Sequence, residues 1–218
     1  MSWAALTSGG KDSILSIQKA LDAGMDVSRM ITVVPENTES YMFHSANLKA
    51  VPVMAERAGM AYTEIRSAGE KEQEILDMQA GIARLDIEGL IVGAIASEYQ
   101  RSRVAAVCRA LGLKLFAPLW GMAPLDVLRE VASRMDARIV VTAADGLGEN
   151  VLGKRIDEAL ISVLLAAEKK RRIHIAGEGG EYESLVFNAP FFSSPLNASG
   201  MQVRCSGMAG KAVWERFW

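Results

Sequence analysis

The sequence predicts an α/β fold, in which a first domain built on a parallel sheet is followed by a smaller α+β domain. Half of the 218 residues are hydrophobic and 23% are charged, so the chain can bury a substantial core and is not disordered. Short β-type runs alternate with helical patterns through the first half, which is typical of a parallel sheet with helices on both faces. Beyond about residue 172 only short strand patterns remain. We therefore expect the two domains at residues 1–120 and 121–218.

The first half contains four strand–helix pairs, and ligands of such a sheet bind at the carboxyl ends of its strands. The expected strands and helices are, in order, Trp3–Thr7 and Asp12–Ala23, Arg29–Val34 and Asn47–Ala58, Tyr62–Ile65 and Lys71–Leu85, and Gly89–Ala94 and Arg103–Leu111. Helices and strands should stop at four breaks, which are Gly24, Gly59, Gly112 and Pro118.

The second half is expected to contain two helices and several short strands. Helices at Leu125–Arg134 and Ile156–Arg172 flank a strand at Arg138–Thr142 and a glycine-rich loop at Asp145–Gly153. That loop lacks the third glycine of G-x-G-x-x-G, so we interpret it as a flexible connection. The remaining strands are expected at Arg172–Ala176, Leu185–Asn188, Met201–Ser206 and Lys211–Glu215.

Apolar runs and charge exclude several classes of protein. The longest apolar stretches, Leu90–Ala96 and Ile139–Ala144, fall short of the ~20 residues of a membrane-spanning helix. No positively charged region precedes the first strand, so we expect no signal peptide and a cytoplasmic location. Acidic and basic residues are spread evenly and the formal net charge is −2, so we expect no direct binding of nucleic acid.

The two cysteines, Cys108 and Cys205, are too few and too far apart for a thiolate metal site or a C-x-x-C redox pair. In the cytoplasm both would stay reduced. We expect both side chains to be buried.

The most specific feature is the hexapeptide SGGKDS, which lies between a predicted strand and a predicted helix. Its adjacent glycines, Gly9 and Gly10, let the backbone approach a bulky anion, and a helix N-terminus favours negative charge. Ser8 and Ser13 add hydroxyl groups, while Lys11 adds a positive charge. The pattern predicts a phosphate-binding turn. The competing interpretation is an ordinary helix start, with Ser8 as its cap and Asp12 in its first turn.

The hexapeptide is not a Walker A loop, which requires G-x-x-x-x-G-K-[ST]. It is similar to the pyrophosphate loop of the PP-loop ATPases, which have the HUP, Rossmann-like fold and cleave ATP between the α- and β-phosphates. The resemblance implies adenylation, with release of AMP and pyrophosphate. Lys11 and the loop amides would hold the pyrophosphate, and Asp12 would help to position a magnesium ion.

Two residues outside the hexapeptide are further candidates for contact with the nucleotide. Thr32 lies in the second predicted strand. His44 could orient a phosphate or transfer a proton near neutral pH. A lone histidine beside an aromatic residue is equally often a packed loop residue, and this alternative remains open for His44.

Several further segments narrow the resemblance within the PP-loop superfamily. The chain looks like the diphthine ammonia ligase family from residue 4 to about residue 190, and it resembles the short, archaeal-type form rather than the larger eukaryotic members. The segments that carry this likeness are GEGGEYES at Gly177–Ser184, ESYMFH at Glu39–His44, GAIASEYQR at Gly93–Arg101, and Pro118–Trp120.

The resemblance implies a ligase that amidates diphthine, a modified histidine of translation elongation factor 2, to diphthamide. ATP would first convert the carboxylate to an acyl adenylate, because ammonia cannot displace an oxide. The implied cofactors are ATP and magnesium, and the implied partners are the diphthine-bearing factor and ammonia. A homodimer is compatible with this interpretation.

The segment after the fourth strand offers catalytic candidates on the ligand side of the sheet. We expect Tyr99 and Gln100 to contact the substrate from a loop or a first helical turn. Arg101 or Arg103 could stabilise charge on the α-phosphate during adenylation. The alternative is a purely structural ion pair between an arginine and Glu98.

The acidic, glycine-rich segment near residue 180 is the candidate site for the trimethylammonium group that the resemblance implies. A quaternary ammonium cannot donate hydrogen bonds and is recognised by aromatic faces and negative charge. The substrate-binding candidates are therefore Glu178, Gly179, Gly180, Glu181, Tyr182 and Glu183. The alternatives are a turn whose carboxylates face solvent and a segment that serves the nucleotide.

Two other functions stay open at this point. An RNA-thiolating enzyme would also use a PP-loop, but it needs a reactive cysteine and a basic face, which this sequence does not offer. A nucleotide-binding sensor without turnover is compatible with the loop, because binding and catalytic residues overlap there.

Overall fold

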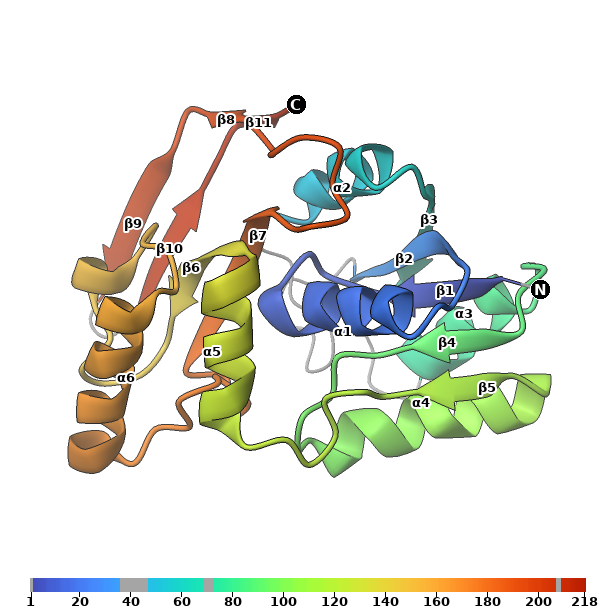
Figure 1. Cartoon of the computed structure of the whole chain (residues 1–218), viewed down its shortest axis with the longest axis horizontal. Helices are drawn as coiled ribbons and strands as arrows, with labels where there is room; N and C mark the ends of the chain where they lie inside the picture. The colour runs from blue at the N-terminus through green and yellow to red at the C-terminus, as the bar shows by residue number, and fades with distance from the viewer. Residues whose placement is uncertain (1, 36–46, 69–72, 207–208) are drawn as a thin grey trace.

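The computed structural model describes residues 2–35, 47–68, 73–206 and 209–218, and it has the expected α/β architecture. Figure 1 shows a parallel sheet in one half of the molecule and an antiparallel sheet in the other. The parallel sheet consists of β1 (Trp3–Leu6), β2 (Val27–Pro35), β3 (Ala61–Ser67), β4 (Gly89–Ile91) and β5 (Lys114–Phe116). Its helices are α1 (Lys11–Asp22), α2 (Val51–Arg57), α3 (Gln73–Ile82) and α4 (Glu98–Leu111).

The strands of the parallel sheet send successive side chains into two different cores. Ala5 and Ile91 belong to the cluster that includes the buried side of α1 and α2. Their neighbours Ala4 and Leu90 belong to the cluster with α3 and α4. Because side chains alternate along a strand, both faces of the sheet are covered by helices.

The strand order β3-β2-β1-β4-β5 creates a switch point in the middle of the sheet. All neighbouring strands are parallel, and the chain moves outward from β1 to β3 before it returns to start β4 on the other side of β1. The loops that follow β1 and β4 therefore diverge, and a crevice forms beyond the carboxyl ends of these two strands.

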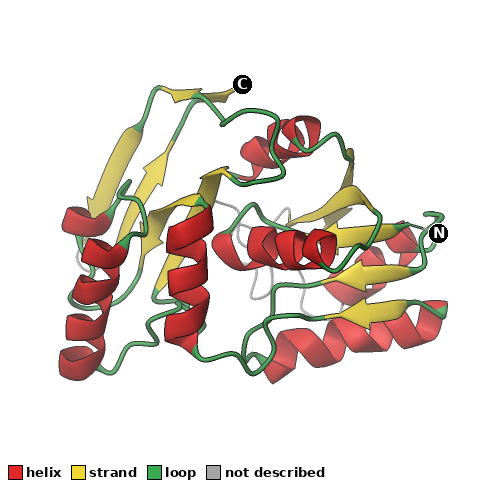
Figure 2. Ribbon diagram, viewed as in Figure 1, coloured by secondary structure: helices red, strands yellow, loops and turns green. Residues whose placement is uncertain are grey.

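The antiparallel sheet has the order β7-β6-β10-β9. Its strands are β6 (Asp136–Thr142), β7 (Tyr182–Asn188), β9 (Gln202–Ser206) and β10 (Ala209–Val213), and β8 (Ala198–Ser199) pairs separately with β11 (Arg216–Phe217). Two helices, α5 (Pro124–Arg134) and α6 (Glu158–Arg171), pack beside this sheet, as Figure 2 shows in red. Within the described part of the chain, no helix has the length and apolar character needed to cross a membrane.

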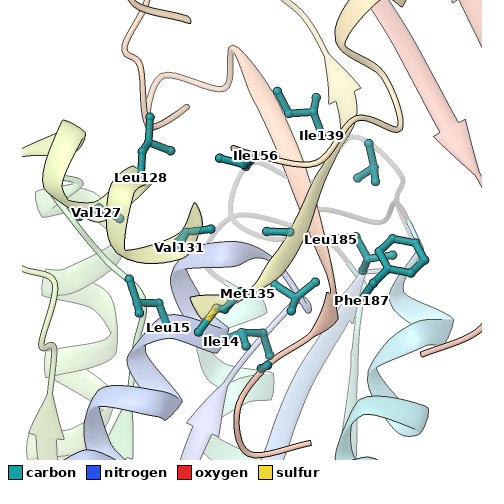
Figure 3. Packing of buried hydrophobic residues seen from close by; sticks show 14 of the residues in the cluster. Ile14, Leu15, Val127, Leu128, Val131, Met135, Ile139, Ile156, Leu185 and Phe187 are labelled. Carbon is teal, nitrogen blue, oxygen red and sulfur yellow. The ribbon is translucent and has the colours of Figure 1, made fainter. Parts of the chain in front are cut away.

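One hydrophobic core joins the two halves of the chain. Figure 3 shows Ile14 and Leu15 of α1 packed close to Val131 of α5 and Leu185 of β7. All four side chains are buried and belong to a single cluster. The antiparallel sheet is therefore held against the first helix of the parallel sheet, and this contact fixes where the start of β7 lies relative to the loop before α1.

The strand expected at Arg172–Ala176 is wrong, because this segment is irregular. Arg172 ends α6 in the left-handed conformation, with φ 56°. The carbonyl of Ile175 then accepts a hydrogen bond from the Tyr182 hydroxyl at 2.7 Å instead of pairing with a strand. Ile173 and Ile175 are both buried, so burial at alternate positions imitates a strand pattern here.

Several boundaries differ from the expected ones for local reasons. Helix α4 begins at Glu98, five residues before the expected Arg103, because the Ser97 side chain caps it by accepting the amide of Gln100. Helix α2 begins only at Val51, after a 3-10 turn. Strands β5, β8 and β11 were not expected, since two or three residues are too few to show a periodicity.

Two expectations about single features are also wrong. Cys108 is buried as expected, and burial raises the pKa of its thiol to about 11, but Cys205 is exposed. Cys205 lies on β9, which forms the edge of its sheet and is exposed along its whole length. The glycine-rich loop is not a flexible connection, because its Leu147 and Val151 side chains are buried in the shared core.

Candidate active site

A pocket of about 610 Å³ opens at the switch point between β1 and β4. Small-molecule sites typically enclose roughly 300–1,000 Å³, so the space suits a nucleotide with part of a second substrate. The lining comes from the ends of β1, β2 and β4, the loop before α1, the start of α4 and the segment before β7. One part of the lining is apolar and consists of Leu6, Ile31, Val33, Val92 and Val104.

A chain of hydroxyl groups orders the loop between β1 and α1. The amide of Gly9 donates to the Thr7 hydroxyl oxygen at 2.9 Å, and Thr7 Oγ1 lies 2.7 Å from Ser13 Oγ. Ser13 itself donates to the carbonyl of Gly10 at 3.0 Å, so Thr7 supplies the proton of the Thr7–Ser13 bond. Gly9 has a φ of +80°, which suits glycine and turns the chain toward α1.

Helix α1 begins without a capping side chain, so Ser8 is not its cap. The first amides of a helix have no partner within the helix. The amide of Lys11 donates to Ser184 Oγ at 3.0 Å, and that serine lies at the start of the antiparallel sheet. This turn borders the pocket, which Ser8, Gly10, Asp12 and Ser13 line, and the N-terminus of a helix favours bound anions.

Lys11 is buried rather than exposed at the surface of the helix start, with 3% of its surface accessible. Its ammonium group donates to the carbonyl of Ala176 at 2.6 Å and to Asp12 Oδ2 at 2.8 Å. It also lies 5.1 Å from the centre of the Tyr182 ring. Burial alone would lower the pKa of Lys11, but Asp12 and Tyr182 raise it above its ordinary value, so the side chain stays charged.

Asp12 lines the pocket, and one of its carboxylate oxygens is buried without a hydrogen-bond partner among the described residues. Its Oδ2 is bonded to Lys11, whereas its Oδ1 is buried and has no hydrogen-bond partner among the described residues. Burial raises the pKa of Asp12, and Lys11 counteracts only part of this shift. A cation at Oδ1 would remove the cost of this unsatisfied oxygen.

The buried position of Lys11 predicts a large effect on stability. Replacing Lys11 with methionine is expected to lower the free energy of unfolding by about 3 kcal/mol, because Asp12 loses its ion partner and Ala176 its donor. Lys19 is a matched control, since it lies on the same helix but forms a partly exposed ion pair with Glu130. Lys19→Met should cost less than about 1 kcal/mol. Equal losses for both variants in chemical denaturation would contradict the anchoring role of Lys11.

Two protein-family models together match most of this chain. The family model described as the diphthamide synthase N-terminal domain matches residues 1–115, and the model of the diphthamide synthase C-terminal domain matches residues 123–216. The chain belongs to the diphthamide synthase family.

The names of similar curated proteins are consistent with this family assignment. The protein named diphthine–ammonia ligase of Rattus norvegicus is 33% identical, with 88% of this chain and 81% of that protein covered. The protein of the same name from Homo sapiens is 31% identical, with 92% and 84% covered. The one from Schizosaccharomyces pombe is 32% identical, with 91% of this chain but 36% of that protein covered.

One solved structure, described as a predicted subunit of tRNA methyltransferase from Methanocaldococcus jannaschii, is 16% identical to this diphthamide synthase family member. The superposition has a TM-score of 0.48 and covers 87% of this chain and 98% of that chain.

In this diphthamide synthase family member, the acidic segment near residue 180 does not form the expected cage. Glu181 lies outside the pocket lining, because its two oxygens accept the amides of His174 at 2.7 Å and Gly179 at 2.9 Å. Tyr182 is buried, and its ring faces Lys11. Burial raises the pKa of Tyr182 to about 12. Glu181 therefore offers no free carboxylate to the pocket, whereas Tyr182 lines the pocket with its hydroxyl bonded to the carbonyl of Ile175.

Four further candidates of this segment line the pocket as Tyr182 does. Gly179 and Gly180 are exposed within it, and Glu178 and Glu183 are partly buried. The two oxygens of the Glu178 carboxylate are not equally engaged in the structure, since Oε2 accepts the amides of Ala96 and Ser97 before α4.

Of the four candidate residues at the start of α4, two line the pocket and two do not. Tyr99 and Gln100 lie in the first helical turn and line the cavity. Arg101 and Arg103 are not part of the lining. The guanidinium of Arg101 lies 4.5 Å from the centre of the Trp120 ring and 3.6 Å from the Glu98 carboxylate. That of Arg103 lies 3.8 Å from the centre of the Tyr99 ring.

Of the two remaining candidates for contact with the nucleotide, the structure describes only Thr32. Thr32 lines the pocket and donates its hydroxyl proton to the carbonyl of Thr7 at 2.9 Å, so it also ties β2 to the end of β1. His44 lies outside the described residues.

Three site residues could not be singled out from the sequence. Thr7 organises the hydroxyl chain, Ser184 binds the amide of Lys11, and Gly93 lies directly against the backbone of α1. Gly93 and Ser184 stand within segments that carry the family resemblance, which was the available signal for both. Thr7 offered no signal beyond its place at the end of the first strand.

Proposed function

We propose that this chain catalyses the ATP-dependent amidation of diphthine on translation elongation factor 2 with ammonia, forming diphthamide. The observation that carries the proposal is a phosphate-binding loop that shares one pocket with the GEGGEYES segment, in a chain whose curated relatives are named diphthine–ammonia ligase. The enzyme is accordingly a ligase that forms a carbon–nitrogen bond.

The proposed chemistry has two balanced steps. A carboxylate oxygen of diphthine attacks the α-phosphorus of ATP, which forms an acyl adenylate and releases pyrophosphate. The nitrogen of ammonia then attacks the acyl carbon, the bond from that carbon to the AMP oxygen breaks, and one proton is released. The products are the amide, AMP and pyrophosphate.

The pocket supports a definite orientation for ATP. The amides at the start of α1 and the hydroxyl groups of Ser8 and Ser13 suit the β- and γ-phosphates, because they present donors where charge develops as pyrophosphate leaves. The apolar lining, which includes Ile31 and Val92, suits the adenine ring. Lys11 contributes a fixed positive charge behind the loop rather than a mobile contact.

Magnesium fits the residues at the phosphate end. Asp12 would hold the ion through its unpartnered Oδ1, since magnesium bound to nucleotides is held by one or two carboxylates together with phosphate oxygens. When bound, the ion neutralises negative charge on the phosphates.

In this proposal the two parts of the chain bind different substrates. Residues 1–120 form the ATP-binding domain in this proposal, and residues 121–218 form the substrate-binding domain. The side of the pocket formed by Tyr99, Gln100, Gly179, Gly180 and Glu183 would receive the diphthine side chain. Arg101 and Arg103 remain candidates for the α-phosphate only if the start of α4 rearranges with substrate.

The test is the reaction itself. The protein is incubated with magnesium, ATP, ammonium and the diphthine-bearing factor. We expect an amidated diphthine peptide in mass spectrometry, together with equal amounts of AMP and pyrophosphate and no ADP, because cleavage occurs at the α-phosphate. Omitting ammonium should abolish the amide. ADP formed in step with amidation would reject the adenylate.

The same assay separates the two alternative functions. A thiolating enzyme should lose turnover in a Cys108→Ser, Cys205→Ser double variant, although neither cysteine lines the pocket. A sensor should bind ATP without forming AMP. Full amidation by the double variant would exclude both alternatives at once.

A further inference from the structure

The start of helix α4 is held by a carboxylate from the other half of the chain. Glu178 Oε2 accepts the amide of Ala96 at 3.1 Å and the amide of Ser97 at 3.2 Å. The two amides precede the first turn of α4, where the helix dipole places partial positive charge. A carboxylate at this position therefore stabilises the helix start through both hydrogen bonding and charge.

The cap that α4 supplies for itself is weak by comparison. The Ser97 hydroxyl accepts the amide of Gln100 at 3.4 Å, a long distance for such a bond. The first turn of the helix carries Tyr99 and Gln100 into the pocket. The position of these two side chains thus depends on how firmly Glu178 holds the turn.

Glu178 is itself held in a tight, preorganised turn. Gly177 has a φ of +78°, and its amide donates to the carbonyl of His174 at 2.8 Å. Gly180 donates to the carbonyl of Gly177 at 3.1 Å. The Glu181 carboxylate braces the turn by accepting the amides of His174 and Gly179. A turn fixed by this many bonds loses little entropy when Glu178 binds α4.

The same stretch of chain also reaches the helix that carries the phosphate loop. The carbonyl of Ala176 accepts a bond from the Lys11 ammonium, and Ser184 accepts the Lys11 amide. Residues 176–184 therefore contact the starts of both α1 and α4, the two helices that flank the switch point. This segment connects the phosphate end of the pocket with the end formed by α4.

We propose that Glu178 is a positioning residue that fixes the start of α4, and with it Tyr99 and Gln100, for the acceptor substrate. The proposal rests on the proposed function, because it assigns those two side chains to the diphthine side of the pocket. In this proposal Glu178 does not bind the trimethylammonium group directly, because its Oε2 already accepts two amides before α4.

Two substitutions distinguish positioning from recognition of charge. Glu178→Gln keeps an oxygen that can accept both amides but removes the charge. Glu178→Ala removes the acceptor altogether. Asp157→Ala is the matched control, because Asp157 caps the equally long helix α6 by accepting the amide of Leu160 at 2.9 Å and does not line the pocket.

For Glu178→Ala we expect hydrogen exchange at the Ala96 and Ser97 amides, measured by NMR, to become about tenfold faster or more, because a bond to a charged acceptor is lost. The value of kcat/KM for the diphthine-bearing factor should fall about tenfold, while the KM for ATP changes less than about twofold. Glu178→Gln should restore turnover to within about threefold of the unmodified enzyme. Asp157→Ala should leave both kinetic constants unchanged.

Two results would overturn the proposal. One is a Glu178→Gln variant that turns over as poorly as Glu178→Ala although its two amides exchange at the unmodified rate, since charge and not position would then matter. The other is unchanged exchange in Glu178→Ala. A failure of the unmodified protein to amidate the factor would reject the proposed function instead, and the exchange measurements would still decide whether Glu178 holds α4.

Discussion

Replacing Asp12 with asparagine is expected to reduce the formation of AMP and pyrophosphate by about 100-fold or more. The variant keeps the shape of the side chain and an oxygen that can accept from Lys11, but it loses the charge that would hold magnesium at Oδ1. Charge stabilisation by a metal at transferring phosphates contributes several kcal/mol to the transition state. Quantifying both products with saturating ATP and magnesium measures the effect.

The control for this variant is another aspartate in the first turn of a helix. Asp126 occupies that place in α5, is exposed and does not line the pocket. Asp126→Asn should form both products at the unmodified rate. Normal turnover by Asp12→Asn would remove Asp12 from the magnesium site and leave it only as the partner of Lys11.

Replacing Gly93 with alanine is expected to damage both stability and activity. A Cβ atom at this position would lie 2.6 Å from the amide nitrogen of Ser13 and 2.7 Å from the carbonyl carbon of Asp12, so the backbone of α1 would have to move. Overpacking of this kind costs about 1–3 kcal/mol of unfolding free energy. A displacement of about 1 Å at the phosphate loop can reduce kcat/KM about 100-fold.

Gly148→Ala provides the comparison for this substitution. Gly148 has a φ of −106°, and the atom nearest to an added methyl group would be the Asn150 side-chain oxygen at 3.5 Å. Thermal unfolding and ATP turnover of this variant should match those of the unmodified protein. If Gly93→Ala also matched the unmodified protein in both measurements, the close approach of Gly93, after β4, to the start of α1 would not be needed.

The sequence was sufficient to predict the features that depend on local pattern. Alternation of strands and helices predicted the parallel sheet, and the hexapeptide lies between a strand and a helix as predicted. Both follow from periodicity and from the chemistry of glycine and a helix N-terminus, which neighbouring residues reveal without knowledge of distant contacts.

The roles of individual site residues could not be predicted in the same way. The sequence suggests that Lys11 is a free positive charge. In the structure its ammonium donates to Asp12 and Ala176 and lies near the Tyr182 ring. The Glu181 carboxylate and the Tyr182 hydroxyl are also engaged within the protein, although by partners only two to seven residues away. Contacts between residues more than 160 positions apart leave no trace in local spacing, and they decide which groups remain available for substrate.

The bonds from Lys11 to Ala176 and Ser184 span 165 and 173 residues of the chain. During synthesis, the ribosome makes the loop before α1 more than 160 residues earlier than either of these partners. The Lys11 ammonium and amide therefore lack these two partners until residues 176–184 have been made. Such distant pairings slow folding, because the entropy of closing a long loop must be overcome before the contact forms. We therefore expect the loop before α1 to reach its final bonding late in folding, after β7 has packed against α1.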